Sequence, residues 1–220
     1  MANGDAFEDA VRLARETATL DVGCHLALVQ GPSLLNARPL PETPLQLVAA
    51  LVRGQIDIYS ELRAQIEKIL SAGIRPTHLD THKHTHIVPQ VFRTVVRLAA
   101  EFGILYVRRP AYALANSYYR RVASAHNIRM TDHFLGFRLT GSLGEESFAR
   151  AILSLREGTT EFMCHPGSLG PELKRARTRL KESRVRELEA LTSPRIRQLM
   201  AAESIHLEAF GTSSSDPAGR

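Results

Sequence analysis

The sequence predicts an α/β fold of parallel strands, arranged either as an open doubly wound sheet or as a barrel. Two observations predict this class. Short apolar segments bounded by turn residues alternate with segments whose apolar residues recur at helical spacing, a pattern typical of βαβ units. Histidines also stand at or just beyond three of the predicted strand ends, where reactive groups gather in both architectures.

The first part of the chain alternates helix, strand and helix. Residues 7–14 carry apolar side chains at helical spacing, and residues 21–29 form a short apolar segment that fits a buried strand. A proline-rich stretch from Gly31 to Pro44 is long enough to form a lid or a substrate loop. The next helix is predicted over residues 56–70, with Gly73 as its C-terminal cap.

The remainder of the chain repeats this alternation. We expect a strand over residues 76–80, a helix that begins at Pro89, and a strand over residues 104–107. Residues 111–142 mix polar and aromatic side chains and give no firm assignment. The elements expected beyond them are a helix over 145–156, a strand over 160–165, and helices near 179–191 and 194–200.

Composition predicts one globular domain over residues 1–210 and a disordered tail over 211–220, since 44% of the 220 residues are hydrophobic and 23% are charged. The start of the chain lacks a signal peptide, and its two cysteines lie far apart, which predicts a cytoplasmic protein. The longest apolar run, Leu47 to Val52, is too short for an integral membrane segment. The formal charge of +5 is modest and the basic stretch Lys174 to Arg186 contains no aromatic residues, so we expect no nucleic-acid partner.

The densest group of reactive side chains lies between residues 78 and 86, where four of the nine histidines and one aspartate occupy every second position. These residues are His78, Asp80, His82, His84 and His86. Imidazole is the commonest side-chain metal ligand. Alternate residues of an extended strand share one face, but this run lies at a predicted strand end. We therefore expect it to bend and to aim only two or three of these groups at a common centre.

Each member of this run has its own expected role. His82 follows the strand end and is the strongest candidate metal ligand. His84 and His86 remain open as ligands, as groups that orient a ligand, or as substrate contacts. Asp80 has three plausible roles: metal ligand, general base, or acceptor for an imidazole N–H. His78 begins the strand, well away from His82, and is interpreted as structural.

Two further histidines, His25 and His165, lie at other predicted strand ends. Spacing alone leaves each of them open as a core residue or as a site residue. A cysteine directly precedes each one, namely Cys24 and Cys164. Since neighbours in a strand face opposite ways, we expect the cysteines to pack under helices and not to join the same metal.

Three stretches carry a resemblance to a known family. Pro-Thr-His-Leu-Asp-Thr-His-Lys-His-Thr-His, Val-Gly-Cys-His-Leu-Ala-Leu and Met-Cys-His-Pro-Gly resemble the YdjC-like carbohydrate deacetylases, which include chitooligosaccharide and hopanoid-associated deacetylases. The similarity extends from Met1 to about Phe210. It implies a distorted (β/α) barrel of parallel strands. It also implies an enzyme that uses one divalent metal ion to remove the acetyl group from an N-acetylated amino sugar, oligosaccharide or glycolipid.

The resemblance also implies roles for individual residues. The two metal histidines of the family correspond to His25 and His82, and its later histidine, a candidate general acid, corresponds to His165. We assign Asp80 as the second catalytic candidate. The candidates for substrate binding are His84, His86, Asp132 and His133. Zinc, cobalt, nickel or manganese suits two imidazoles and a carboxylate better than magnesium, but the resemblance leaves magnesium, zinc or a similar ion as the expected cofactor.

The sequence departs from the family at its start. It contains no counterpart of the strand with an Asn-Ala-Asp-Asp-Phe-Gly type motif, and it begins where the second strand would be. We therefore expect an incomplete barrel that lacks its first strand, in a truncated sequence, with strand edges that favour a homodimer. The alternatives are a catalytically impaired metal- or carbohydrate-binding relative, and a metallophosphoesterase or amidohydrolase.

Overall fold

The computed structural model describes residues 1–111, 116–176 and 178–212, and the chain divides into two compact units. The first unit comprises Met1–Met130 and the segment that begins at Ala209, and the second comprises Thr131–Glu208. The predicted domain over residues 1–210 spans both units. Of the predicted tail, residues 213–220 lie outside the described residues.

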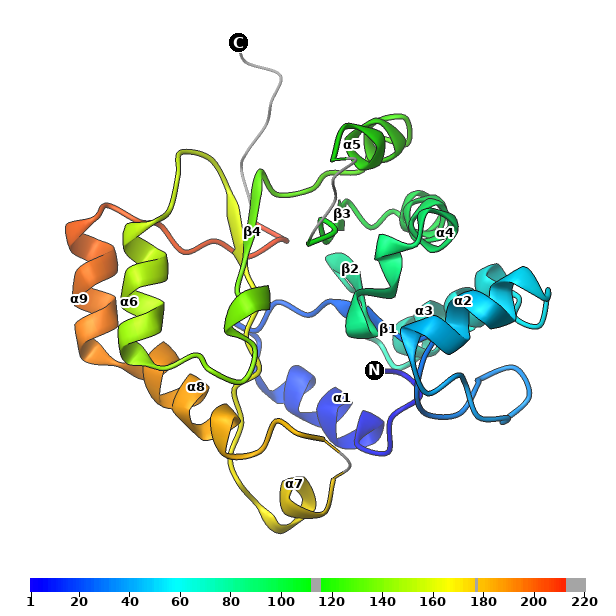
Figure 1. Cartoon of the computed structure of the whole chain (residues 1–220), viewed down its shortest axis with the longest axis horizontal. Helices are drawn as coiled ribbons and strands as arrows, with labels where there is room; N and C mark the ends of the chain where they lie inside the picture. Colours follow the sequence, from blue (N-terminus) through cyan, green and yellow to red (C-terminus); the bar gives the residue numbers. More distant parts are fainter. Residues whose placement is uncertain (112–115, 177, 213–220) are drawn as a thin grey trace. The chain divides into compact units, whose positions relative to one another are not determined.

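The first unit is built on a parallel sheet of three strands, β1 (Cys24–Leu26), β2 (His78–Thr81) and β3 (Tyr106–Val107), in that order. Its remaining elements are α1 (Phe7–Glu16), α2 (Pro44–Val52), α3 (Ile58–Ser71), the 3-10 helix η1 (His82–Ile87), α4 (Pro89–Glu101) and α5 (Asn116–Ser124). Helix α3 contacts β1, and α4 contacts β2, β3, α3 and α5 (Figure 1). The strands are parallel because a helical connection separates each from the next.

The core of the first unit lies between these helices and the sheet. Leu26, Leu62, Ile66, Leu79 and Phe92 are fully buried in one hydrophobic cluster. Helix α4 begins at Pro89, as predicted, because proline needs no hydrogen-bond acceptor for its nitrogen in the first turn. Helix α3 begins after Asp57, whose carboxylate accepts a hydrogen bond from the backbone N–H of Ser60.

Strand β1 is shorter than the predicted strand over residues 21–29, and a buried side chain explains where it ends. The backbone N–H of Ala27 donates to Oε1 of Gln65 over 2.8 Å, and the Ala27 carbonyl accepts from Nε2 of the same side chain over 2.8 Å. Gln65 of α3 therefore takes the place of a neighbouring strand. Glu61, one turn earlier in α3, accepts from Ser33 Oγ and from the backbone N–H of Leu34, which fixes the start of the proline-rich loop.

The second unit contains a parallel pair of strands, β4 (His133–Leu135) and β5 (Thr160–Phe162). Its helices are η2 (Phe137–Leu139), α6 (Glu145–Leu153), α7 (Pro171–Arg175), α8 (Glu182–Thr192) and α9 (Pro194–Ala202). Helix α6 packs against α8 and α9 (Figure 1), and Leu143, Phe148 and Ile196 are buried in this cluster. Gly136 turns the chain after β4 with φ 95°, and a Cβ there would lie 2.0 Å from the Met163 carbonyl oxygen.

The predicted α/β class with parallel strands is confirmed. The strands of the described residues form a three-stranded and a two-stranded sheet, and they do not close into a barrel. The segment over residues 111–142, which the sequence left unassigned, contributes α5, β4 and η2. Among the described residues, no helix has both the length and the apolar character needed to cross a bilayer.

Candidate functional site

Parallel pairing of β1 and β2 places His25 directly opposite Asp80. His25 Nδ1 lies 2.9 Å from Asp80 Oδ1, and the other carboxylate oxygen of Asp80 forms an ion pair with Arg108, which directly follows β3. The Arg108 side chain and Asp80 are both largely buried. Three adjacent strands therefore supply one connected group of polar side chains, in which Asp80 accepts from an imidazole N–H, one of the three roles that the sequence left open.

The charge state of Asp80 follows from these contacts. Burial acts to raise the pKa of this carboxyl group, since it removes water from the charged form. The neighbouring His25, its hydrogen bond, and the positive charge of Arg108 act in the opposite direction and outweigh burial. The pKa of Asp80 is therefore held well below its ordinary value, and the group is an ionised hydrogen-bond acceptor.

His82 begins η1, immediately after β2, and its ring faces that of His25. His82 Nδ1 lies 3.3 Å from His25 Nε2, and the ring centroids are 5.4 Å apart with an interplanar angle of 77°. On the opposite side of its ring, His82 Nε2 lies 3.0 Å from Gln30 Oε1. Burial, with the nearby charges of His25 and Lys83, lowers the pKa of His82 to about 4, so this imidazole is neutral at pH 7.

The facing nitrogens of His25 and His82 fit a shared metal ion. Two nitrogens bound to a tetrahedral ion at about 2.0–2.1 Å lie roughly 3.3 Å apart, which matches the separation of His25 Nε2 and His82 Nδ1. Across the part of the chain that the structure describes, no group of three or more His, Cys, Asp or Glu side chains is placed to hold a metal ion. The first unit thus offers two imidazole donors, while both oxygens of Asp80 are already engaged.

The histidine run bends directly after His82, as the sequence predicted. Lys83 and His84 both have left-handed backbone angles, with φ of 51° and 52°, so the alternation of a strand is lost. His86 is turned inward and is 1% exposed, with Nδ1 2.6 Å from Thr81 Oγ1. Burial and the nearby His84 lower the pKa of His86 to about 3. The substrate-binding roles expected of His84 and His86 stay predictions.

His78, at the start of β2, packs as the structural residue that the sequence predicted. Its ring lies over Gly23, where a Cβ would come within 2.2 Å of Nε2, and it stacks against Phe210 with centroids 4.2 Å apart. Burial lowers the pKa of His78. Gly23 is therefore required by the close approach of an imidazole ring.

Three predicted site residues belong to the second unit. The backbone N–H of His165 donates to the carboxylate of Glu187, a buried residue of α8. Asp132 Oδ2 accepts from both the backbone N–H and the hydroxyl of Thr159. His133 Nε2 lies 3.1 Å from the Glu157 carbonyl oxygen. The catalytic role of His165 and the substrate-binding roles of Asp132 and His133 stay predictions.

The two cysteines also lie in different units. Cys24 is completely buried in the core of the first unit, and burial raises the pKa of its thiol to about 12. Cys164 belongs to the second unit, where it packs against the hydrophobic cluster. Both clusters contain apolar residues of helices, which agrees with the expectation that the cysteines pack under helices.

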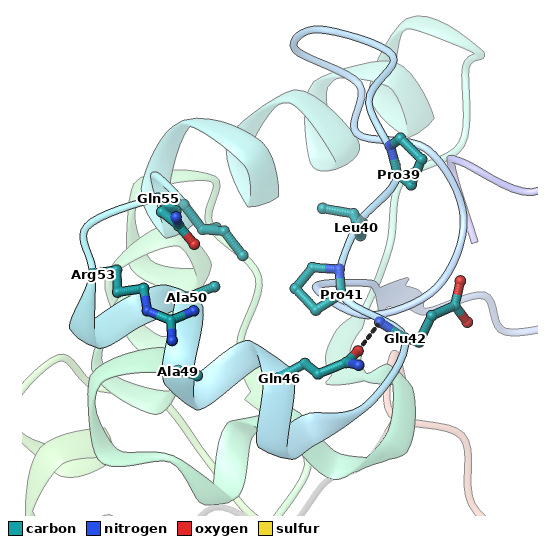
Figure 2. Close-up of a pocket in the computed structure, with 10 residues that line it drawn as sticks. Pro39, Leu40, Pro41, Glu42, Gln46, Ala49, Ala50, Arg53 and Gln55 are labelled. Carbon is teal, nitrogen blue, oxygen red and sulfur yellow. Dashed lines mark hydrogen bonds between the residues drawn. The ribbon is translucent and has the colours of Figure 1, made fainter.

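The proline-rich loop borders an open hollow of about 450 Å³ (Figure 2). Pro39, Leu40 and Pro41 line one side, and Gln46 and Arg53 of α2 and its cap line the other. The Glu42 backbone N–H donates to Gln46 Oε1 over 2.9 Å, and the Glu42 carbonyl accepts from Lys83 Nζ over 3.2 Å. The loop is thus tied to η1, next to His82, but the hollow is lined by neither His25 nor His82.

Three residues that contact the candidate site residues were not identified from the sequence. Gln30 has a φ of 62° and precedes Gly31, so a turn at the end of β1 brings it to His82. Arg108 follows a strand that the sequence did predict, and its position there was the available signal. Glu187 is one acidic residue among several in a helix, and the sequence contains no sign that this one is buried.

Comparisons of the sequence with known proteins find a family and several relatives. The profile of the family described as YdjC-like protein matches residues 1–202. A carbohydrate deacetylase of Clostridium beijerinckii is 34% identical over 217 residues, which cover 96% of this chain and 85% of the relative. A carbohydrate deacetylase of Geobacillus stearothermophilus is 35% identical over 215 residues, which cover 94% of this chain and 82% of the relative.

A solved structure supports the architecture as well. A protein of Enterococcus faecalis V583 named for cellobiose-phosphate cleavage aligns with a TM-score of 0.81 at 21% identity. The alignment covers 96% of this chain and 85% of that chain, and it bears on the fold alone. Since the family profile and the relatives each match most of the sequence, this chain belongs to the YdjC-like protein family.

Proposed function

We propose that this protein is a metal-dependent carbohydrate deacetylase that hydrolyses the N-acetyl group of an amino sugar, an oligosaccharide or a glycolipid. The observation that carries the proposal is the pair of facing imidazole nitrogens, His25 Nε2 and His82 Nδ1, 3.3 Å apart next to the ends of two parallel strands. The names of the curated relatives, carbohydrate deacetylases, support the same reaction class.

His25 and His82 are the residues that would hold the metal ion. Imidazole donors suit zinc, cobalt, nickel or manganese better than magnesium, which prefers oxygen ligands. When bound, such an ion supplies polarisation of the amide carbonyl and lowers the pKa of a water molecule. His82 is neutral at pH 7, because its pKa is lowered to about 4 by burial and nearby charges, and it therefore has a lone pair available for a ligand bond.

The other residues hold protons or hold their neighbours in place. Asp80 stays ionised beside Arg108 and accepts from His25 Nδ1, so its contacts favour a role in positioning His25. His165 is our candidate for the group that protonates the departing amine. Its backbone N–H donates to the carboxylate of Glu187. This hydrogen bond fixes the position of the His165 backbone, from which the imidazole extends.

Acetate release from N-acetylglucosamine oligosaccharides tests the proposal. We expect the protein loaded with zinc or cobalt to release acetate, and His82→Ala or removal of the metal with a chelator to abolish it. His126→Ala is the matched control, because His126 is an exposed histidine of the same unit. Acetate release that survives both the substitution and the chelator would contradict the mechanism.

The same measurements separate the alternative functions. Zinc binding that depends on His25 and His82, without acetate release from any N-acetylated sugar, would indicate a catalytically impaired metal-binding relative. Phosphate release from p-nitrophenyl phosphate in the absence of acetate release would indicate a metallophosphoesterase.

A further inference from the structure

The two facing histidines are each bound on the far side of the ring by a different kind of group. His25 Nδ1 lies 2.9 Å from Asp80 Oδ1, and His82 Nε2 lies 3.0 Å from Gln30 Oε1. An ionised carboxylate accepts hydrogen bonds and cannot donate them. The proton of a neutral His25 is therefore on Nδ1, and the amide oxygen of Gln30 likewise selects the His82 tautomer with its proton on Nε2.

These two tautomers leave an unprotonated nitrogen on each ring at the place where the rings meet. A neutral imidazole has one N–H and one lone pair, so the lone pairs of His25 Nε2 and His82 Nδ1 point at one another across 3.3 Å. Two lone pairs at that distance repel unless a cation lies between them. The arrangement is thus organised for a shared cation, and the groups outside the two rings create it.

We propose that Gln30 and the Asp80–Arg108 pair are positioning residues, which fix His25 and His82 in the tautomers that direct one lone pair from each ring toward a shared divalent metal ion. The proposal rests on the proposed metal-dependent function and names the residues that prepare the site for its ion. Hydrogen bonds of this kind to metal-binding histidines raise metal affinity by about 10–100-fold.

Backbone hydrogen bonds place both positioning groups beside the two histidines. Arg108 directly follows β3, and its backbone N–H donates to the Leu79 carbonyl over 2.9 Å, which keeps its side chain beside Asp80. Gln30 has a φ of 62°, and its backbone N–H donates to the Pro41 carbonyl over 2.8 Å. Pro41 belongs to the proline-rich loop, so this loop contributes to the site by placing Gln30.

A simple hydrogen bond between the rings is the competing arrangement. If the Gln30 amide were reversed, its N–H would donate to His82 Nε2, and the His82 proton would move to Nδ1 and point at His25. The two arrangements differ in the position of one proton. They also differ in the effect expected of Gln30→Glu, whose side chain can only accept a hydrogen bond. This substitution should preserve metal affinity in the first arrangement and lower it in the second.

Two measurements decide between these arrangements. Long-range ¹H–¹⁵N spectra of metal-free protein labelled at histidine should show His25 protonated at Nδ1 and His82 protonated at Nε2. Calorimetric titration with Zn²⁺ should show an affinity about 10–100-fold weaker in Gln30→Leu than in the unsubstituted protein. Gln30→Glu, which accepts only, should bind Zn²⁺ at least as tightly as the unsubstituted protein. Gln90→Leu, an exposed glutamine of the same unit, should bind Zn²⁺ unchanged.

The proposal is overturned if metal-free His82 has its proton on Nδ1, if Gln30→Leu binds Zn²⁺ as tightly as the unsubstituted protein, or if Gln30→Glu binds it tenfold more weakly. Gln30→Glu keeps the test decisive even if Gln30→Leu does not fold. Acetate release by the same preparations tests the proposed function separately. Expected tautomers and Zn²⁺ affinities without acetate release would support the positioning roles and count against the deacetylase.

Discussion

Asp80 is the residue on which the arrangement of the first unit's site depends. It is 6% exposed, and it contacts the imidazole Nδ1 of His25 on one oxygen and the guanidinium of Arg108 on the other. Breaking a buried ion pair by removing one partner is costly, because the remaining charge stays buried without compensation. Asp80 therefore contributes both to the free energy of unfolding of this unit, through Arg108, and to the position of His25.

We expect Asp80→Asn to lower the free energy of unfolding by roughly 3–5 kcal/mol, the usual cost of breaking a buried ion pair by removing one partner. Urea denaturation followed by circular dichroism measures this loss. The double variant Asp80→Asn with Arg108→Met should recover part of the stability, since it removes the buried cation together with the carboxylate that balances it. A double variant as unstable as the sum of the two single variants would show that the ion pair contributes nothing beyond its separate members.

His86 makes stability depend on pH. Its pKa is lowered to about 3 in the folded protein, against about 6.5 in an unfolded chain. Between these values the unfolded chain binds more protons, so the free energy of unfolding falls as the pH drops below about 6.5. We expect His86 to account for a loss of about 2 kcal/mol between pH 7 and pH 5.

Urea denaturation at the two pH values measures this loss. His86→Gln should reduce the difference between pH 7 and pH 5 by most of that amount, whereas His126→Gln, at an exposed position, should leave it unchanged. An unaltered pH dependence in His86→Gln would mean that other groups cause the acid sensitivity. His82, whose pKa is lowered to about 4, contributes with the same sign.

At the scale of elements, two buried side chains on helices determine where strands end. Gln65 of α3 bonds both backbone groups of Ala27 after β1, and Glu187 of α8 bonds the backbone N–H of His165 shortly after β5. In each case a helix supplies the hydrogen bonds that a further strand would otherwise provide. The segments that follow these strands carry Gln30 and His165, so helix packing positions the candidate site residues.

We expect Glu187→Ala to lower the stability of the protein by about 1–3 kcal/mol, because it removes the acceptor of the partly buried His165 N–H. Glu187→Gln keeps an acceptor oxygen and should lose less. Glu189→Ala, at an exposed position of the same helix, is the control and should change little. Thermal unfolding of the three variants measures the difference, and equal stability of Glu187→Ala and Glu189→Ala would exclude this role for α8.

At the scale of the whole molecule, a bound metal ion should stabilise the folded chain. A ligand at a free concentration of 100 times its dissociation constant adds about 2.7 kcal/mol to the free energy of unfolding. We expect Zn²⁺ to raise the thermal midpoint of the unsubstituted protein, and His25→Ala to lose most of that increase. If Zn²⁺ raised the thermal midpoint of His25→Ala by the same amount, the zinc would be bound at a site that does not include His25. The homodimer and the cytoplasmic location expected from the sequence stay predictions.

The sequence by itself determined the α/β class, the start of α4 at Pro89, and the family, because helical periodicity, proline at a helix start and short motifs are local properties of the chain. Through the family resemblance, the sequence also selected His25 and His82 as a pair of candidate metal ligands. The tertiary structure decided which groups surround them. Parallel register sets His25 opposite Asp80, 55 residues away, and brings Arg108 and Gln30 to the same place. Contacts between residues so distant in sequence arise from the pairing of strands and the packing of helices, which no local pattern specifies.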